Sequence, residues 1–293
     1  MAMVRRSLQP GAARRRRRIR WQGVVTHALT WSFSLFLLLP IYQMAVTALK
    51  AEPEIWYSPP TLYAREPTLS NFVAMLQIVP RLPVHLLNSF VYGLGVSLLS
   101  LLIALPAAYG LSRFRVPGEA AIVFGLTYAN MFAPIMLVVP LYSIMRRLGL
   151  LDTHLAMVVA GSIFTLPLST LLLSTYFRTV PREIDEAALV DGCSRPGALV
   201  RVVLPLVAPA VVAVGIYAFI TGWSQQFVLS LVLIQSPDLM PITQGLYQFF
   251  SRSSVRWPEL MAASTVAAAI PVALFVAVQR YIVQGLTAAA IKG

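Results

Sequence analysis

Four carboxylates, Glu183, Asp185, Glu186 and Asp191, lie close together in one polar stretch of this chain. Such a group can hold a magnesium ion through its oxygens, or it can pair with basic groups on a partner protein. A magnesium site of this kind normally needs a second acidic cluster, and the other acidic residues lie singly or in different segments. A membrane enzyme that uses a metal is therefore the weaker hypothesis, and metal-dependent activity of the purified chain would support it.

Other reactive residue types are few and scattered. The single cysteine, Cys193, excludes an intramolecular disulfide, and the three histidines His27, His85 and His154 form no pair at metal-ligand spacing. The sequence also lacks the phosphate-binding pattern Gly-x4-Gly-Lys-Ser/Thr. Any ATP that drives this protein must therefore be bound and hydrolysed by a separate subunit.

The composition indicates a membrane protein. Of the 293 residues, 58% are hydrophobic and 12% charged, with a mean hydropathy of +0.74, whereas soluble domains carry about a quarter charged residues. All Asp, Glu, Lys and Arg residues lie outside six uncharged stretches, each long enough to cross a bilayer, which takes roughly 20 residues. These stretches predict an all-α protein with six transmembrane helices, at 24–49, 82–112, 120–145, 153–177, 202–237 and 260–279.

The basic residues predict the orientation, because Lys and Arg accumulate in cytoplasmic segments. They favour a cytoplasmic placement of both termini, with inside segments at 1–23, 113–119, 178–201 and 280–293. The run Arg14–Arg18 also invites a nucleic-acid hypothesis. Directly before a first span, an anchor that touches anionic lipid headgroups is the better explanation. The uncharged stretch after it is too long for a typical cleaved signal peptide.

Local chemistry predicts two short helices in the polar stretch. Pro181 suits a first helical turn, and the carboxylates that follow it interact favourably with the helix dipole. Gly192 suits the left-handed position that ends a helix. Ser194 can then cap a second short helix, which Leu204-Pro205 is expected to terminate.

The first of these helices carries one compact face, in which Ile184, Ala187, Ala188 and Asp191 recur at helical spacing. A helix lying on the membrane is disfavoured, because the carboxylates would be repelled by anionic lipid. A solvated connector is the simplest alternative, but it does not explain two adjacent alanines. A docking face for a partner protein is therefore preferred.

The spacing Glu186-Ala187-Ala188-x3-Gly192-x9-Val202-x-Leu204-Pro205 resembles the signature of the permease subunits of bacterial ABC importers. The resemblance implies a type I importer membrane domain, in which this segment is a coupling helix seated in a cleft of a cytoplasmic ATPase subunit. It also implies that Glu186 pairs with a basic residue there. The residues to which it assigns the coupling are Glu186, Ala187, Ala188, Asp191, Gly192, Leu204 and Pro205.

Further motifs resemble the smaller permease subunit of maltose-type transporters, and together they cover roughly residues 30 to 293. They are Lys50 with Glu54-Ile55, Asn71, Asn88-Ser89, Ala107-Ala108-Tyr109-x-Leu111-x-Arg113-Phe114-x-x-Pro117-Gly118, Pro140-Leu141-Tyr142, Leu148-Gly149-Leu150-x-Asp152-Thr153 and Gly285-Leu286-Thr287-x-x-Ala290-x-Lys292-Gly293. The loop around 235–259 looks like the outside loop that helps to dislodge sugar from the binding protein in these transporters.

This resemblance implies a multi-pass protein of the cell membrane, with an Arg-rich tail at 1–23, a six-span permease domain at 24–287 that includes the coupling loop 178–205, and a short tail at 288–293. The implied partners are a second permease subunit, a dimer of ABC ATPase subunits, an extracytoplasmic sugar-binding protein, a sugar and membrane lipid, but no nucleic acid. No cofactor is expected on this chain, because ATP and magnesium belong to the ATPase. Glycerol phosphate, or the phosphate, metal oxyanions or amino acids carried by other ABC branches, are the alternative solutes.

Contacts with the solute are harder to predict. Many members of the family have Trp-Asn-acid in the fifth span where this chain has Trp223-Ser224-Gln225, so no role of that acid transfers here. Sugars bind to aromatic faces and to amide or hydroxyl groups, which makes Tyr128, Asn130, Trp223, Gln225 and Gln226 the candidates. The amides also serve as ordinary hydrogen bonds between helices in lipid, and that role is slightly preferred.

The second span carries small residues that let membrane helices approach closely. They are Gly93, Gly95, Ser97, Ser100 and Gly110.

Overall fold

The structure is a computed structural model that describes residues 12–250 and 255–290. These residues are almost wholly helical, and an isolated antiparallel bridge pairs Phe250 with Val255. Within these described residues, four helices are long and apolar enough to cross a membrane, namely α1 (Ala12–Ala48), α4 (Leu82–Arg113), α7 (His154–Thr179) and α14 (Trp257–Ala290). They correspond to four of the six predicted spans.

The third predicted span is broken into two helices. α5 (Glu119–Ala129) and α6 (Pro134–Arg147) meet at 102°, separated by residues 130–133. Ala133 is extended (φ −64°, ψ 132°) because the residue before a proline avoids the helical region, and Pro134 then begins a new helix. The third predicted span, 120–145, is therefore a bent pair of helices.

The fifth predicted span also bends. The short helices over Arg195–Leu206 meet α11 (Ala208–Ser224) at 88°, so the straight part begins at Ala208 and continues through α12 (Gln226–Leu233). Counting each bent pair as one span gives up to six spans in the described residues, which agrees with the predicted number. Shorter elements are α2 (Glu52–Ile55), α3 (Ser70–Ile78), η2 (Pro237–Leu239) and α13 (Ile242–Tyr247).

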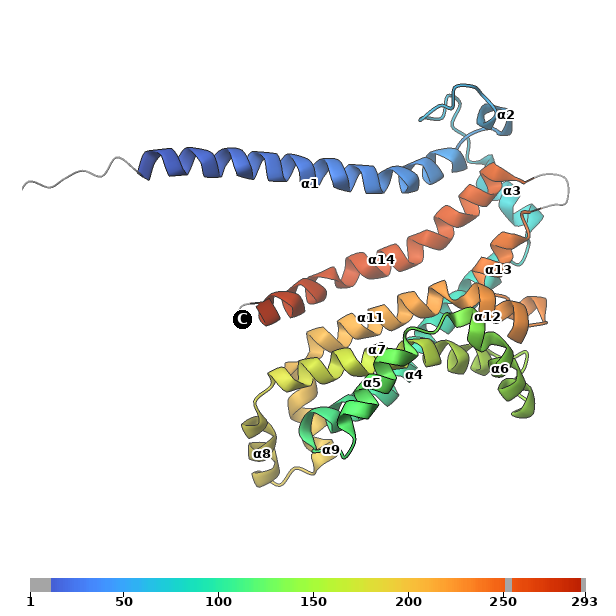
Figure 1. Cartoon of the computed structure of the whole chain (residues 1–293). Coiled ribbons are helices and arrows are strands. Elements are labelled where there is room, and N and C mark those ends of the chain that lie inside the picture. Colours follow the sequence, from blue (N-terminus) through green and yellow to red (C-terminus); the bar gives the residue numbers. More distant parts are fainter. Residues whose placement is uncertain (1–11, 251–254, 291–293) are drawn as a thin grey trace, which may run out of the picture.

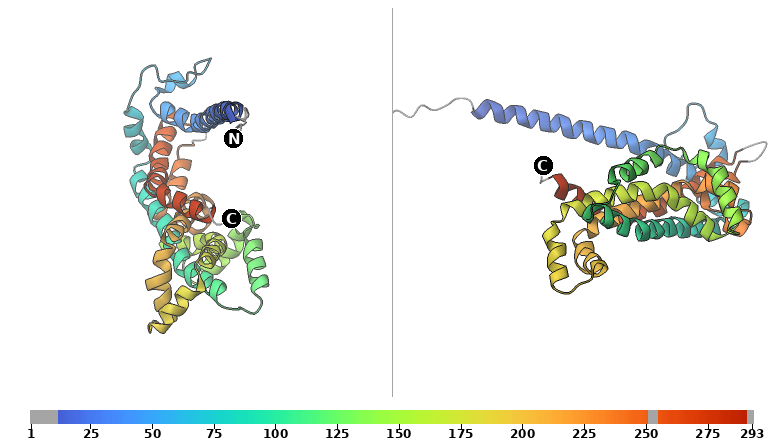
Figure 2. Two further views of the ribbon diagram at one scale, coloured as in Figure 1. Left: turned by 90° about the vertical axis from the view of Figure 1, so that its left-hand side faces the viewer. Right: turned by 60° about the horizontal axis from the view of Figure 1, so that its bottom comes forward.

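The bundle has two distinct ends. α8 (Arg182–Val190) and α9 (Arg195–Ala198) project at one end, whereas α2, α3 and α13 gather at the other (Figure 1). The second view in Figure 2 shows the same separation. We call these the hairpin end and the loop end. α1 leaves the bundle, and none of its most apolar window is buried, so its surface is left for lipid or another chain.

The central packing joins α4, α7 and α11 and depends on glycines. A Cβ added at Gly161 or Gly222 would lie 2.6 or 2.9 Å from the side chain of Val96, and one at Gly95 would lie 2.6 Å from Val158. Gly93 likewise leaves room for the Phe219 ring. Close approach was thus predicted correctly for Gly93 and Gly95, but not for Gly110, around which a Cβ would meet nothing within 4 Å.

Polar side chains reinforce this packing. Ser97 Oγ donates to the carbonyl of Gly215 at 2.7 Å, and the hydroxyls of Ser100 and Thr165 share a hydrogen bond. All three hydroxyl-bearing side chains are buried. Such bonds matter in lipid because no water is present to satisfy a polar group.

We expect Gly222→Ala to lower the thermal stability of the purified protein by about 1–3 kcal/mol, because the added methyl group overpacks the contact with Val96. Thermal unfolding in detergent measures this. Gly110→Ala adds the same methyl group where space is open and should not destabilise the protein. Equal losses for the two variants would contradict the packing described.

Candidate coupling surface and solute pathway

Residues 181–198 form a polar hairpin of two short helices, as the sequence predicted. Gly192 has a left-handed backbone (φ +84°) between α8 and α9. The Ser194 hydroxyl caps α9 by accepting a hydrogen bond from the amide of Gly197 at 3.3 Å. Pro181 lies at the N-cap, one position before α8 begins.

The return from the polar hairpin to the bundle differs from the prediction. A π-helix at Leu199–Val203 follows α9, and α10 (Leu204–Leu206) continues beyond Pro205 before the bend at Val207. Pro205 lies in the first turn of α10, where its missing N–H costs little. Leu204-Pro205 therefore does not end the helical run, which extends to Leu206.

The face of α8 that points outward is also rotated from the expected one. Ile184 is half-buried and Ala188 is buried against the chain's own core, whereas Glu186, Ala187 and Val190 are exposed. Val190, at 87% exposed, is an apolar side chain with no cover in this chain. Ala187 and Ala188 thus face different surroundings, and the outward surface is formed by the residues on the Ala187 side. Asp191 and Gly192 are exposed at the tip.

A buried ion pair fixes α8 to the bundle. Asp185 Oδ2 lies 2.8 Å from Arg113 Nε, and the Tyr109 hydroxyl donates to Oδ1 at 2.8 Å. The two charged side chains are only 7% and 10% exposed. At this depth each charge offsets part of the cost of burying the other. This pairing of Asp185 with Arg113 was not predicted from the sequence.

The carboxylates of the polar hairpin do not come together at one point. Asp185 is occupied by Arg113, whereas Glu186 points outward. Among the described residues, no group of three or more His, Cys, Asp or Glu side chains is placed to hold a metal ion. The geometry therefore gives no support to a magnesium enzyme.

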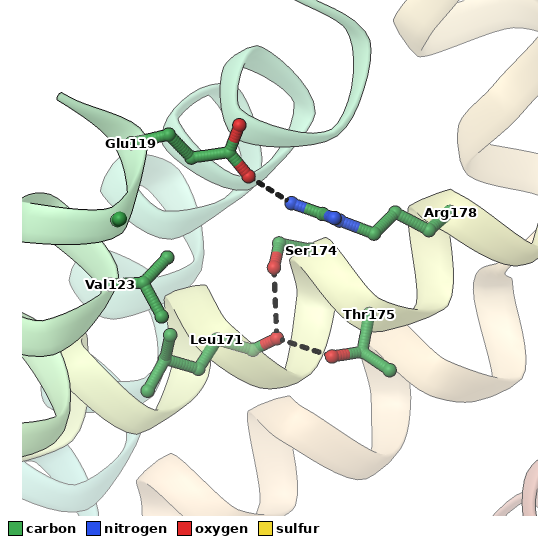
Figure 3. A pocket seen from close by; sticks show the side chains of 7 residues that line it. Glu119, Val123, Leu171, Ser174, Thr175 and Arg178 are labelled. Atoms are coloured by element: carbon green, nitrogen blue, oxygen red, sulfur yellow. Dashed lines mark hydrogen bonds and ion pairs between the residues drawn. The ribbon is translucent and has the colours of Figure 1, made fainter. Parts of the chain in front are cut away.

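Beside the polar hairpin, a pocket of about 610 Å³ lies between α5 and α7. The ion pair between Arg178 and Glu119 spans it (Figure 3), and both side chains are partly exposed. The hydroxyls of Ser174 and Thr175 donate to the carbonyl of Leu171. These hydroxyl donors are therefore already bonded within α7. The pocket lies where the ion pair joins the start of α5 to the end of α7.

A second cavity, of about 500 Å³, lies beside the break in the third span and brings three predicted residues together. Tyr128 and Asn130 line it from the end of α5, and Gln225 lines it from the end of α11. Tyr217 and Thr221, which were not predicted from the sequence, also line it. Together with Gln225 they recur every four residues, so the signal was a polar stripe on an otherwise apolar helix.

Trp223 and Gln226 lie elsewhere. Trp223 packs in the core with its ring 5.8 Å from that of Phe219. Gln226 is 1% exposed and donates from Nε2 to the carbonyl of Ser89 at 2.9 Å. Gln226 thus forms a hydrogen bond between helices, which was the preferred interpretation of both amides. Gln225 instead lines the cavity.

Several motif residues at the loop end shape the backbone there. Glu54 Oε1 accepts from the amide of Arg65 at 2.9 Å, and Asn71 Nδ2 donates to the carbonyls of Ala48 and Lys50, both at 2.8 Å. Lys50 itself is buried, with its Nζ against the carbonyl of Thr61. These residues hold the segment between α1 and α4 together.

Asp152 is a further motif residue with a structural task. It has a left-handed backbone (φ +58°), which Asp tolerates better than most residues. Its carboxylate accepts hydrogen bonds from the hydroxyl and amide of Ser236 and from the amide of Gln235. These bonds hold the pKa of Asp152 below its usual value. The attachment is therefore complete at neutral pH and is lost as the pH falls through that lowered pKa.

Comparison with known proteins agrees with this architecture. Residues 12–288 match the family model described as "Binding-protein-dependent transport system inner membrane component". The chain therefore belongs to this family of membrane subunits of binding-protein-dependent transporters.

Individual relatives are similar over most of their length. The sulfoquinovosyl glycerol transport system permease protein SmoH of Agrobacterium fabrum is 36% identical, covering 87% of this chain and 89% of the relative. The trehalose/maltose permease MalG of Thermococcus litoralis is 33% identical (89% and 93%), and the diacetylchitobiose uptake permease DasC of Streptomyces coelicolor is 32% identical (88% and 92%). A solved bacterial ABC transporter of the acidic polysaccharide alginate shares the fold, with a TM-score of 0.73 at 22% identity over 89% of this chain and 96% of that one.

We expect Asp185→Asn and Arg113→Gln each to destabilise the protein by about 3–5 kcal/mol, because each leaves one buried charge without its partner. The double variant leaves no unpaired charge and should lose less than either single variant. Thermal unfolding of the four proteins measures this. Losses that simply add would contradict the ion pair.

Proposed function

We propose that this chain is one of two membrane subunits of an ATP-driven importer for a sugar or related polyol. Membership of the binding-protein-dependent family supports the importer, and relatives named for sugar transport support the solute class. In this proposal a dimer of ATPase subunits holds ATP and magnesium, and a binding protein delivers the solute. The observation that carries the proposal is the polar hairpin, whose exposed helix face is fixed to the bundle by a buried ion pair.

The ATPase docks, in this proposal, on the outward face of α8. Ala187 permits close approach, the carboxylate of Glu186 can meet a basic residue, and Val190 offers exposed apolar area. Gly192 gives the turn its shape, and Asp191 lies exposed beside it. Leu204 and Pro205 would act indirectly, in the helical run that leads from the polar hairpin into α11.

The proposal assigns the hairpin end to the cytoplasm. The excess of Lys and Arg in the segments on that side supports this orientation. α1 begins and α14 ends toward the same end (Figure 1), which is consistent with two cytoplasmic termini. The loop end would then face the binding protein.

The solute path runs, in this proposal, past the cavity beside the break in the third span. A non-helical backbone at membrane depth is tolerated where protein or a water-filled cavity covers it. Residues 130–133 fit this description, with the polar groups of Asn130, Thr221 and Gln225 lining the adjacent cavity. None of the lining residues is charged, which favours a neutral polyhydroxy solute over glycerol phosphate for this subunit's share of the path.

We expect Ala187→Trp to abolish copurification of the ATPase subunit, because the large ring prevents close docking on α8. Ala187→Ser is the matched control, since it keeps the side chain small and should retain the partner. Affinity purification from native membranes, with the copurified proteins identified by mass spectrometry, makes the comparison. Equal recovery of the ATPase subunit with both variants would contradict the docking face.

We expect Thr221→Val and Gln225→Ala each to raise the KM for uptake about fivefold, as the loss of one hydrogen bond worth ~1 kcal/mol requires. Uptake of radiolabelled maltose, trehalose and glycerol into cells that carry the complete transporter identifies a transported solute for the comparison. Ser224→Ala changes a neighbouring residue that does not line the cavity and should leave the KM unchanged. Unchanged KM values for the two cavity variants would place the path elsewhere.

A further inference from the structure

Besides the ion pair between Arg113 and Asp185, other contacts attach the polar hairpin to the last turn of α4, at the hairpin end. From α8, Arg182 Nη2 donates to the carbonyl of Ser112 at 3.4 Å, and Arg178 Nη2, at the end of α7, donates to the carbonyl of Leu111 at the same distance. These carbonyls belong to the last turn of α4, where the helix dipole favours cations.

The second helix of the hairpin makes an attachment of its own. The Arg195 guanidinium, at the start of α9, lies 4.7 Å from the centre of the Phe114 ring, at the cation–π distance. Phe114 directly follows α4 as its C-cap residue. Both helices of the polar hairpin are thus tied to the same end of one transmembrane helix.

The other end of α4 holds a loop equally firmly. We call residues 235–242 the far loop. Asn88 Nδ2 donates to the carbonyls of Asp238 and Met240 at 2.7 and 3.0 Å, and the Tyr92 hydroxyl donates to that of Leu239 at 2.6 Å. Ser89 Oγ accepts from the amide of Ile242 at 2.8 Å, and His85 Nε2 lies 3.1 Å from the carbonyl of Pro237.

These four side chains form one buried stripe. Residues 85, 88, 89 and 92 recur at helical spacing, and each is at most 5% exposed. Their bonds go to the backbone of the far loop rather than to its side chains. Because the four side chains are buried, their hydrogen bonds are costly to break, so the far loop must follow the end of α4 that lies at the loop end.

α4 is continuous between these two attachments. It runs unbroken from Leu82 to Arg113, a length of roughly 48 Å at 1.5 Å per residue. The third and fifth spans are both bent, by 102° and 88°. α4 therefore joins the polar hairpin to the far loop without a break in its backbone.

We propose that α4 carries the movement of the polar hairpin across the membrane to the far loop. Arg113 and Asp185 are positioning residues at one end, and Asn88 and Ser89 are positioning residues at the other. The proposal rests on the proposed function, in which ATPase subunits move the polar hairpin. In return, the solute-loaded binding protein at the loop end would signal to the ATPase through the same helix.

The test places a reporter cysteine at Gln235, an exposed residue of the far loop, after Cys193 has been replaced by serine. The complete transporter is reconstituted in lipid discs, and the labelling rate with a maleimide is measured with and without ATP plus orthovanadate. We expect the trapped state to change the rate severalfold in the parent. The difference should disappear in the double variant Arg113→Gln/Asp185→Asn and in Asn88→Ala.

Two controls separate this effect from general damage. Thr175→Val removes an exposed hydrogen bond within α7 at the hairpin end, and Arg81→Gln removes an exposed ion pair with Asp238 at the far loop. Both should respond like the parent. A full response in the double variant and in Asn88→Ala, or none in the parent, would overturn the proposal. Failure of an ATPase subunit to copurify with the parent would instead overturn the proposed function.

Discussion

The buried pair of Arg113 and Asp185 is the interaction on which the rest of this arrangement depends. Neither charge can remain in its place without the other, because a buried charge that loses its partner costs several kcal/mol. The pair joins a polar hairpin, which interrupts an apolar chain, to a transmembrane helix at the centre of the bundle. A segment held in this way cannot move as a free loop, so a force on the polar hairpin reaches the bundle.

The bilayer imposes the second constraint, because every backbone polar group at its centre must be satisfied by the protein. Continuous helices such as α4 and α7 satisfy most of their backbone groups internally, and glycines at their contacts allow hydrogen bonds such as that from Ser97 to Gly215. At the break, residues 130–133 lie outside the regular hydrogen bonding of a helix, so other parts of the protein or water must satisfy the backbone groups left without a helical partner. This irregular stretch of the third span lies beside a cavity lined with polar groups. The proposed solute path therefore runs past that cavity.

Local chemistry made much of the fold predictable from the sequence. Gly192 and Ser194 indicated the turn and the cap of the polar hairpin because both features depend on neighbouring residues alone. The uncharged stretches located the spans because the apolar character of a span is also a property of consecutive residues. The partner of Asp185 was not predictable, because it comes from a distant segment. Gln225 and Gln226 show the same limit: adjacent amides face a cavity and a buried carbonyl, and only the rotation of the helix decides which.

The most direct test of the central claim is whether the polar hairpin and α4 move as one body. Spin labels at Leu189 on α8 and at Leu102 on α4, both exposed and neither part of the proposed docking face, report this distance by pulsed electron paramagnetic resonance in the complete transporter. The distance should be the same with and without ATP plus orthovanadate, whereas a pair at Leu189 and Val272 on α14 should change. A Leu189–Leu102 distance that changes between the two states would contradict the account.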